Sequence, residues 1–274
     1  MISPSAAVGT VVSLWRYPVK SMQGEELNAS AVGTRGLLGD RAYALVDAAD
    51  GKIASAKNPR KWPNLFAFRA AYADAPRAAT ETTPVRITLP DGTLTGSDRP
   101  ELASLLAPVL GRSIALHAAV PEKPVLEEYW PDIEGLDHRD AVTDEAMPAG
   151  TFFDLAPIHL LTTATLDRLR ALYPPGRFEV RRFRPNIVVA VDGAPQEFAE
   201  NDWVGRTLRI GSQVRLHVTR PCGRCVMTTL PQSDLPADPG ILRAAVQHNR
   251  GHVGIYATVV RGGTIRRGDT LTLE

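Results

Sequence analysis

Short alternating or apolar runs, each soon ended by glycine, proline or an Asp-Gly pair, recur along most of the chain. Residues 11–17 alternate as a half-buried strand does, and Asp50-Gly51 and Asp91-Gly92 are typical of hairpin turns. Helical spacing is confined to short stretches, chiefly residues 101–110 and 165–172. The pattern therefore predicts a mostly β (α+β) protein with a few short helices.

The chain has 274 residues, enough for two domains or one large domain with a substantial core. Short strands and turns up to residue 116 predict an N-terminal β-barrel-like domain over residues 1–116. Residues 117–150 are acidic, contain prolines and lack periodicity, so we expect a connecting or covering loop there. This loop would open the second domain, a larger β-barrel over residues 117–274.

The second half shows one helix start and several strands. Residues 157–163 look like a strand that ends in a helix cap, and residues 187–191 form a buried-strand run. Further strands are expected at residues 203–211 and 214–218. Residues 253–260 and 264–273 predict a closing hairpin around Gly262-Gly263.

Charge and hydropathy exclude several classes of partner. The formal net charge is +1 and the pI is about 7.9, so no basic field attracts nucleic acid or anionic membranes. The first ten residues lack the features of an export signal, and no stretch approaches 18 apolar residues, so no membrane span is expected. Two cysteines suit a reducing compartment. We expect a cytoplasmic monomer.

Both cysteines lie in one short segment, residues 219–229. Pro221 and Gly223 are expected to end the strand ladder before them and to open a loop that a ligand can reach. Arg220 and Arg224 flank the cysteines, and nearby guanidinium groups favour the thiolate, the form that binds soft metals or attacks electrophiles. The segment is therefore a candidate metal-ligand or nucleophile site.

Three other interpretations of these cysteines remain open. Cys222 and Cys225 have the spacing of a redox dithiol, although such pairs normally open a helix early in a thioredoxin fold. His248 and His252 lie downstream with a zinc-like spacing, at a longer gap than a zinc finger allows. The cysteines could also be inert parts of a hydrophobic wall.

Four clusters of hydrogen-bond donors stand at strand ends, where an anion such as phosphate could be held. They are Lys20-Ser21, Arg41, Thr162-Thr163, and Arg184 with Asn186. A helix beginning after Thr163 would direct its N-terminal dipole at the same anion. The cysteine segment also follows a strand, so these clusters and the cysteines are expected to converge.

Five segments together resemble the motif series of MOSC-domain proteins. They are, in chain order, Tyr17-Pro18-Val19-Lys20-Ser21, Gly36-Leu37-Leu38-Gly39-Asp40-Arg41, His159-Leu160-Leu161, Phe183-Arg184-Pro185-Asn186-Ile187-Val188-Val189 and Cys222-Gly223-Arg224-Cys225-Val226-Met227-Thr228-Thr229. The resemblance is closer to the branch with an N-terminal β-barrel domain, which includes the mitochondrial amidoxime-reducing component and its bacterial relatives. The segments keep the family's order over nearly the whole chain.

The resemblance implies a molybdenum cofactor, a pyranopterin dithiolene with an oxo-molybdenum centre whose coordination is completed by one protein thiolate. The family's ligand is the second cysteine of the loop, which corresponds to Cys225. The residues that the resemblance assigns to the cofactor's pterin and phosphate are Lys20, Ser21, Arg41, Thr162, Thr163, Arg184 and Asn186.

The implied activity is reduction of N-hydroxylated small molecules, amidoximes and hydroxylamines, by oxygen-atom transfer to reduced molybdenum. Two electrons would come from a separate donor protein, ferredoxin-like or cytochrome b5-like. A soft thiolate on a metal that also carries dithiolene sulfur suits this chemistry. The alternative function is a carrier that holds the molybdenum cofactor, or a persulfide on Cys225, for delivery to another enzyme.

Overall fold

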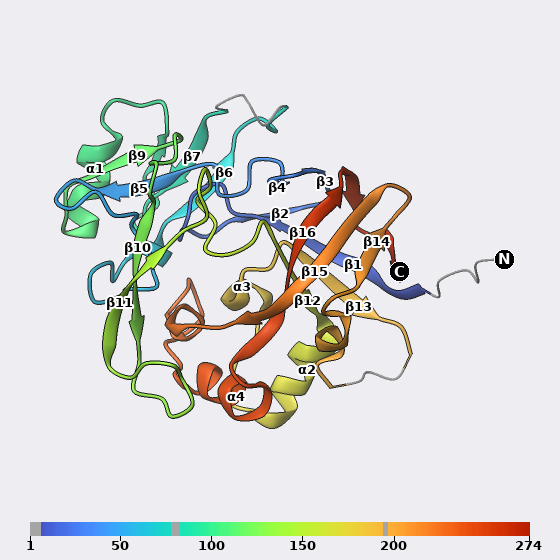
Figure 1. Ribbon diagram of the computed structural model, residues 1–274. Helices are drawn as coiled ribbons and strands as arrows, with labels where there is room; N and C mark the ends of the chain where they lie inside the picture. The colour runs from blue at the N-terminus through green and yellow to red at the C-terminus, as the bar shows by residue number, and fades with distance from the viewer. Residues whose placement is uncertain (1–6, 78–82, 194–196) are drawn as a thin grey trace.

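Strands dominate the molecule, and the mostly β prediction is confirmed. The computed structural model describes residues 7–77, 83–193 and 197–274 (Figure 1). Within these residues the strands form one large sheet and several small ones.

The large sheet closes into a seven-stranded barrel. Its strands, in spatial order, are β13 (Ile187–Val191), β12 (Ile158–Thr162), β16 (His252–Arg261), β15 (Val214–Gly223), β14 (Thr207–Ile210), β18 (Thr270–Leu273) and β1 (Ala7–Arg16). Pairing of β13 with β1 closes the ring, and the short β2 (Glu25–Leu27) extends the sheet beyond β1. Only β12 and β13 pair in parallel among these barrel strands.

The barrel interior is filled by branched aliphatic side chains, as the alternation in the sequence requires. Val11 and Leu14 of β1 face the same core as Ile187 and Val189 of β13. The register between these strands shifts between Val11 and Ser13, so a bulge bends β1 around the barrel. Because β1 closes the ring, the first strand of the chain belongs to the barrel that the second half builds.

The rest of the first half forms small sheets, one of which packs on the barrel core through Val32, Leu37 and Ile265, while the others contribute to a second core. These sheets pair β3 (Ala29–Gly33) with β4 (Gly36–Leu37) and β17 (Gly263–Arg266), β5 (Ala44–Asp47) with β9 (Ile114–His117), and β6 (Arg69–Tyr72) with β7 (Val85–Thr88) and β8 (Leu94–Gly96). The second core includes Phe68, Ile87 and Leu106, and Met227 from the cysteine segment joins it. The two halves are therefore packed together through the cysteine segment.

The helices are short. They are η1 (Leu65–Ala67), α1 (Leu102–Leu110), α2 (Thr163–Leu172), α3 (Val180–Phe183), η2 (Ala199–Trp203), η3 (Val226–Thr229) and α4 (Gly240–Asn249). Helices α2 and α4 share a third core that contains Leu166, Leu169 and Ile241, and they lie together at one end of the molecule (Figure 1). None of the helices in the described residues is long and apolar enough to span a membrane.

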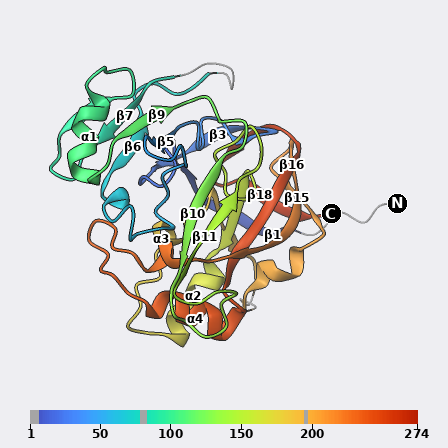
Figure 2. The ribbon, with the colours of Figure 1, turned by 60° about the vertical axis from the view of Figure 1, so that its left-hand side comes forward.

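The segment expected to be a connecting loop contains a hairpin instead. β10 (Val125–Trp130) and β11 (Ala141–Ala146) pair in antiparallel register, with Leu126 opposite Glu145 and Glu128 opposite Thr143. The hairpin runs from the small sheets towards α2 and α4 (Figure 2). These strands could not be recognised in the sequence, because both of their faces carry charged residues and the alternation of apolar and polar positions is weak.

The expected closing hairpin is also wrong. β17 pairs with β3, while β18 pairs with β14 and β1, so the two strands after Gly262 join different sheets. The sequence shows turn signals but not which edges are free to accept a strand.

Strand β15 does not end at Pro221. Pro221 lies opposite Ile255 and Gly223 lies opposite His252, so the ladder continues to Gly223. The register shifts between Val218 and Arg220 and between Pro221 and Gly223. At such a bulge one residue makes no ladder hydrogen bond, so the strand tolerates proline, which has no backbone N–H. The cysteine segment therefore divides, with Cys222 in the strand and Cys225 at the start of η3.

Candidate functional site

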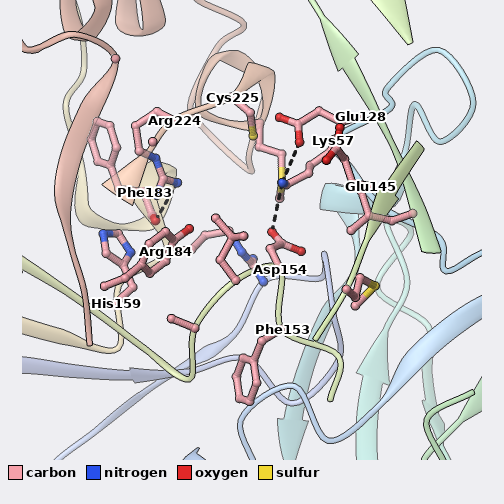
Figure 3. Close-up of a pocket in the computed structure, with 18 of the residues that line it drawn as sticks. Lys57, Glu128, Glu145, Phe153, Asp154, His159, Phe183, Arg184, Arg224 and Cys225 are labelled. Atoms are coloured by element: carbon pink, nitrogen blue, oxygen red, sulfur yellow. Dashed lines mark hydrogen bonds and ion pairs between the residues drawn. The ribbon is translucent and has the colours of Figure 1, made fainter. Parts of the chain in front are cut away.

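A cavity of about 400 Å³ lies between the barrel, the small sheets and the β10–β11 hairpin. The barrel supplies His159 and Tyr256, the loop after β1 supplies Lys20, and the hairpin supplies Trp130 and Glu145. In the view of Figure 3, Glu128 and Glu145 lie on one side of the cavity and Phe183, Arg224 and His159 on the other. Its lining combines apolar surface with many charged groups.

Most of the residues singled out in the sequence meet in this cavity, although they come from four separate stretches. Its lining includes Lys20, Ser21, Arg41, Arg184, Asn186 and Cys225. The topology explains the convergence, because β1, β13 and β12 are consecutive around the barrel, β16 alone separates β12 from β15, and the residues after or before these strands reach the same end.

Thr162 and Thr163 do not line the cavity, and their assignment to the cofactor stays a prediction. The Thr162 hydroxyl accepts from Thr165 N at 3.2 Å and donates to Glu200 Oε2 at 2.6 Å, so it caps α2 and is fully buried. Thr163 is the first residue of α2. Thr162 and the Glu200 carboxylate thus lie at the N-terminus of α2 inside the fold, where the sequence had suggested a bound anion.

Cys225 lies half-buried at the cavity wall, against the second core. It precedes η3 in an extended conformation, and its carbonyl accepts from Thr228 N at 3.2 Å. Burial, reinforced by the Glu128 carboxylate, raises the pKa of the Cys225 thiol to about 11. Without a ligand the thiol is therefore protonated at neutral pH, which corrects the expectation that flanking arginines hold it as thiolate.

The neighbouring Arg224 stabilises the thiolate of the other cysteine, Cys222. Arg224 Nη1 donates to Cys222 Sγ at 2.7 Å, and its Nη2 donates to the Phe183 carbonyl at 3.0 Å. Burial alone would raise the pKa of the Cys222 thiol, but Arg224 and His159 lower it to about 6. Cys222 is fully buried.

A network of two lysines and two carboxylates forms another part of the wall (Figure 3). Lys20 Nζ pairs with Asp154 Oδ1 and donates to the Phe152 carbonyl at 3.0 Å. Lys57 Nζ lies 2.8 Å from Glu128 Oε2 and 3.6 Å from Asp154 Oδ2. Burial lowers the pKa of Lys20, and the two lysines together hold the pKa of Asp154 below its usual range despite burial.

Two arginines stack on one tyrosine ring. The guanidinium carbons of Arg41 and Arg184 lie 4.5 and 4.1 Å from the centroid of the Tyr17 ring. Arg41 pairs with Asp40, and Arg184 Nη1 donates to the Met22 carbonyl at 2.6 Å. Burial and the neighbouring Arg41 lower the pKa of Arg184 to about 10. Two cations are thus held side by side with one adjacent carboxylate.

Ser21 and Asn186 line the cavity but their polar groups also hold the fold together. Ser21 has a φ of 64°, and its hydroxyl accepts from Ala56 N at 3.1 Å. Asn186 Oδ1 accepts from His159 N at 3.0 Å, and its Nδ2 donates to Asp40 Oδ2 at 2.9 Å. The Asn186 amide therefore ties β12 to the loop of Asp40, which positions Arg41.

Lys57, Glu128 and Asp154 belong to the site and were missed in the sequence. Lys57 and Glu128 carry no signal, because a single charged residue on a turn or weak strand looks like solvated surface. Asp154 could have been found in the sequence. Like the four clusters of hydrogen-bond donors, it lies in a break next to a predicted strand, in this case the strand that begins near residue 158.

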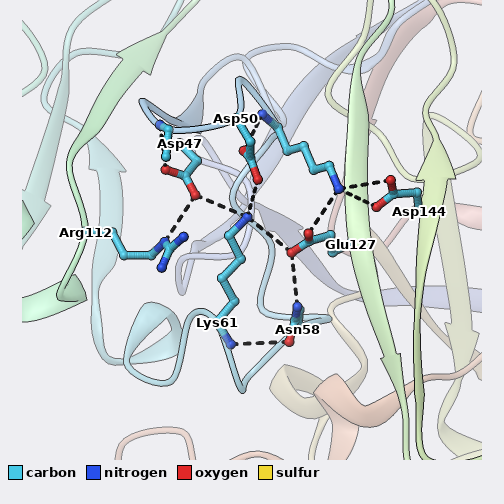
Figure 4. Close-up of polar contacts among 9 residues, drawn as sticks. Asp47, Asp50, Asn58, Lys61, Arg112, Glu127 and Asp144 are labelled. Carbon is cyan, nitrogen blue, oxygen red and sulfur yellow. Dashed lines mark hydrogen bonds and ion pairs between the residues drawn. The ribbon is translucent and has the colours of Figure 1, made fainter.

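The outer face of the hairpin is anchored by a group that we call the Lys61 cluster (Figure 4). Its members are Asp47, Asp50, Lys52, Asn58, Lys61, Arg112, Glu127 and Asp144. Lys61 Nζ lies 2.6 Å from Asp50 and 3.2 Å from both Asp47 and Glu127, while Lys52 Nζ lies 2.7 Å from Asp144. These pairs fix the hairpin against the small sheets.

The described residues contain no group of three or more His, Cys, Asp or Glu side chains arranged to hold a metal ion. A metal at Cys225 would thus need a cofactor to supply its other ligands, as a dithiolene does.

Two family models match the chain. Residues 8–109 match the MOSC N-terminal beta barrel domain, and residues 149–272 match the MOSC domain. Together the two models span most of the sequence. The chain belongs to the MOSC-domain family. Within it, this protein has the N-terminal beta barrel domain as well as the MOSC domain.

The curated relatives of this MOSC protein are mitochondrial amidoxime reducing components. Component 2 of Macaca fascicularis is 29% identical over 81% of this chain and 67% of its own length. Component 2 of Bos taurus is 27% identical over 96% of this chain and 82% of its own length. Among solved structures, the YUAD protein from Bacillus subtilis covers 97% of this chain and 95% of that chain at 14% identity and a TM-score of 0.49, too weak a likeness to support a conclusion.

Proposed function

We propose that this protein binds the molybdenum cofactor in the cavity and reduces N-hydroxylated small molecules, such as amidoximes and hydroxylamines. The observation that carries the proposal is the meeting of one accessible thiol, Cys225, with three cations in one cavity, the buried Lys20 and Arg184 and the half-buried Arg41. A soft sulfur ligand beside a cationic pocket suits an anionic cofactor that holds a soft metal. The names of the curated relatives support the same activity.

The cavity fits such a group. Arg224 Nε is buried and has no hydrogen-bond partner within the described residues, so a bound acceptor would satisfy it. Arg184 has a lowered pKa because it is buried beside Arg41, and a phosphate would relieve that repulsion. Cations also outnumber carboxylates among the lining residues. The cavity therefore offers excess positive charge and an unused hydrogen-bond donor to an anion.

The residues divide the work of holding the cofactor. Cys225 would be the metal ligand, and Lys20, Arg41 and Arg184 would hold the phosphate through charge-assisted hydrogen bonds. Ser21 can still donate its hydroxyl proton to the same anion, whereas Asn186 acts by fixing the loop of Asp40. Lys57 and Asp154 keep the Lys20 ammonium in place.

When bound, the cofactor supplies the two-electron chemistry that removes oxygen from nitrogen. For an amidoxime the N–O bond breaks, two electrons and two protons enter, and the amidine and water leave. The electrons come from a separate small redox protein of the ferredoxin or cytochrome b5 class. The protein binds and orients the substrate and limits water, since the hairpin covers the cavity.

The decisive experiment produces the protein in a host that makes the cofactor and measures its molybdenum content. Benzamidoxime reduction is then followed with a chemical reductant. Wild-type protein should contain molybdenum and form benzamidine, and Cys225→Ser should lose the activity because a hard, high-pKa hydroxyl does not replace a thiolate.

Cys222→Ala is the matched control. Cys222 is buried and bound to Arg224, so its loss should leave a small cavity and a modest decrease in activity. Equal inactivation of both variants would instead point to a dithiol. Bound molybdenum without benzamidine formation in the wild type would indicate the carrier function.

A further inference from the structure

The hairpin forms the wall of the cavity that neither family model covers. The models match residues 8–109 and 149–272, whereas β10 and β11 lie between them. Leu126, Glu128 and Trp130 line the cavity from β10, and Glu145 lines it from β11. This wall therefore lies outside both matched domains.

The two faces of the hairpin differ in how their charges are paired. Glu127 and Asp144 on the outer face pair with lysines of the Lys61 cluster. On the inner face Glu128 pairs with Lys57. Glu145 is the exception: it forms no ion pair with any Lys or Arg of the described residues, although it is half-buried and faces the cavity. A partly desolvated carboxylate without a cation is free to bind one from a ligand.

Glu145 is also held in a fixed orientation. Trp130 Nε1 donates to Thr143 Oγ1 at 2.8 Å, and Thr143 Oγ1 donates to Glu145 Oε1 at 2.7 Å. The three side chains share the inner face because Trp130 pairs with Ala141, Glu128 with Thr143 and Leu126 with Glu145. This relay leaves Glu145 Oε2 without a partner in the described residues and places the Trp130 indole on the same wall.

An indole ring and an oriented carboxylate on one wall are the usual elements of a cation site. The remaining charges of the cavity support the same polarity. Lys20, Arg41 and Arg184 lie on the barrel side, where an anionic group would neutralise them, and the exposed Asp137 joins Glu128 and Glu145 as a third carboxylate on the hairpin side. Arg250 is exposed on the rim and forms no ion pair with Glu145.

We propose that Glu145 and Trp130 form a cation-recognition subsite, so that the N-hydroxylated substrates of this protein are those that carry a positive charge. Thr143 is a positioning residue that acts through Glu145. The substrate class rests on the proposed function, whereas the cation subsite itself does not.

The first test measures binding without turnover. Cofactor-loaded protein is titrated calorimetrically with benzamidine, whose amidinium is charged at pH 7, and with benzamide, its neutral counterpart. Glu145→Gln should weaken benzamidine binding about tenfold or more, since it removes one charge-assisted contact. Thr143→Val keeps the charge and should weaken it about threefold.

Asp144→Asn is the matched control, because it removes the same charge from the adjacent position on the outer face. It should leave the preference for benzamidine over benzamide unchanged. Equal weakening by Asp144→Asn and Glu145→Gln would overturn the subsite in favour of a diffuse field. Undiminished benzamidine binding by Glu145→Gln would overturn it directly.

The second test links the subsite to substrate choice. The compounds are benzamidoxime with a para-trimethylammoniomethyl group and its neutral isostere with a para-neopentyl group, compared by kcat/KM. Wild type and Asp144→Asn should prefer the cation, and the ratio should fall about tenfold in Glu145→Gln. Reduction of both compounds with no charge preference would refute the inference but not the proposed function. Selective benzamidine binding without any turnover would refute the proposed function and keep the subsite.

Discussion

Arg182 is the strongest test of how the cysteine segment is held in place. Its side chain is fully buried, and its guanidinium donates to four backbone carbonyls and pairs with no carboxylate of the described residues. The acceptors are the carbonyls of Arg177 at 2.9 Å, Thr228 at 3.1 Å, Leu230 at 3.2 Å and Pro236 at 2.8 Å. Three of them lie in the stretch that follows Cys225, so this one side chain fixes that stretch against α3.

We expect Arg182→Met to destabilise the protein strongly. A hydrogen bond to a charged group contributes about 1.5–3 kcal/mol, so four bonds set an upper limit of roughly 6–12 kcal/mol. The true loss is smaller, because removing the cation also removes its desolvation cost, which is large enough to lower the pKa of Arg182. Breaking a buried charged network typically costs about 3–5 kcal/mol, and we expect a loss in this range.

Arg181→Met is the matched control. Arg181 is the preceding residue and pairs with Glu179 and Asp234 at 2.7 Å each, but it is half-buried and Asp234 is largely exposed. Such surface pairs contribute about 0–1 kcal/mol. Urea unfolding followed by tryptophan fluorescence measures both variants, and the alkylation rate of Cys225 at fixed pH reports local loosening. A loss below about 1 kcal/mol in Arg182→Met, or equal losses in the two variants, would refute the reasoning.

Two further predictions concern the acid range and backbone geometry. Burial opposes ionisation of Asp47, but the Ala49 N–H and the Lys61 and Arg112 side chains lower its pKa; its contribution to stability is therefore present above about pH 4 and lost as the pH falls through the folded value. Asp47→Asn should thus show a smaller loss of stability between about pH 5 and pH 3 than wild type in urea titrations, and an unchanged slope would contradict this. Gly254 has a φ of +82°, and a Cβ there would lie 2.4 Å from His159 Nε2, so Gly254→Ala should cost about 2–4 kcal/mol in thermal unfolding. Gly33→Ala, where no atom lies within 4 Å of the added Cβ, should cost under about 1 kcal/mol, and similar costs for both would count against the steric argument.

The sequence predicted much of the local structure and part of the site. Residues 187–191 form β13 as expected, and the strand expected at residues 157–163 leads into α2 through a helix cap, which is Thr162, with α2 beginning at Thr163. Six of the eight proposed cofactor residues line one cavity. Whether they bind the cofactor, and whether the chain divides into domains near residue 116, remain predictions.

The sequence determined what depends on neighbouring residues. Alternation and Gly or Pro breaks reflect the local backbone, so strands, short helices and the positions of polar residues at strand ends could be deduced from them.

Only the tertiary structure decided which distant groups meet. β1 pairs with β13, although more than half of the chain separates them in the sequence, and no local sequence pattern predicts that pairing. The same holds for the charges, because Arg224 donates to Cys222 while burial and Glu128 act on Cys225. Glu145 likewise looks like an ordinary surface carboxylate in the sequence. No Lys or Arg of the described residues pairs with it, because the residues that surround it in space come from distant parts of the chain.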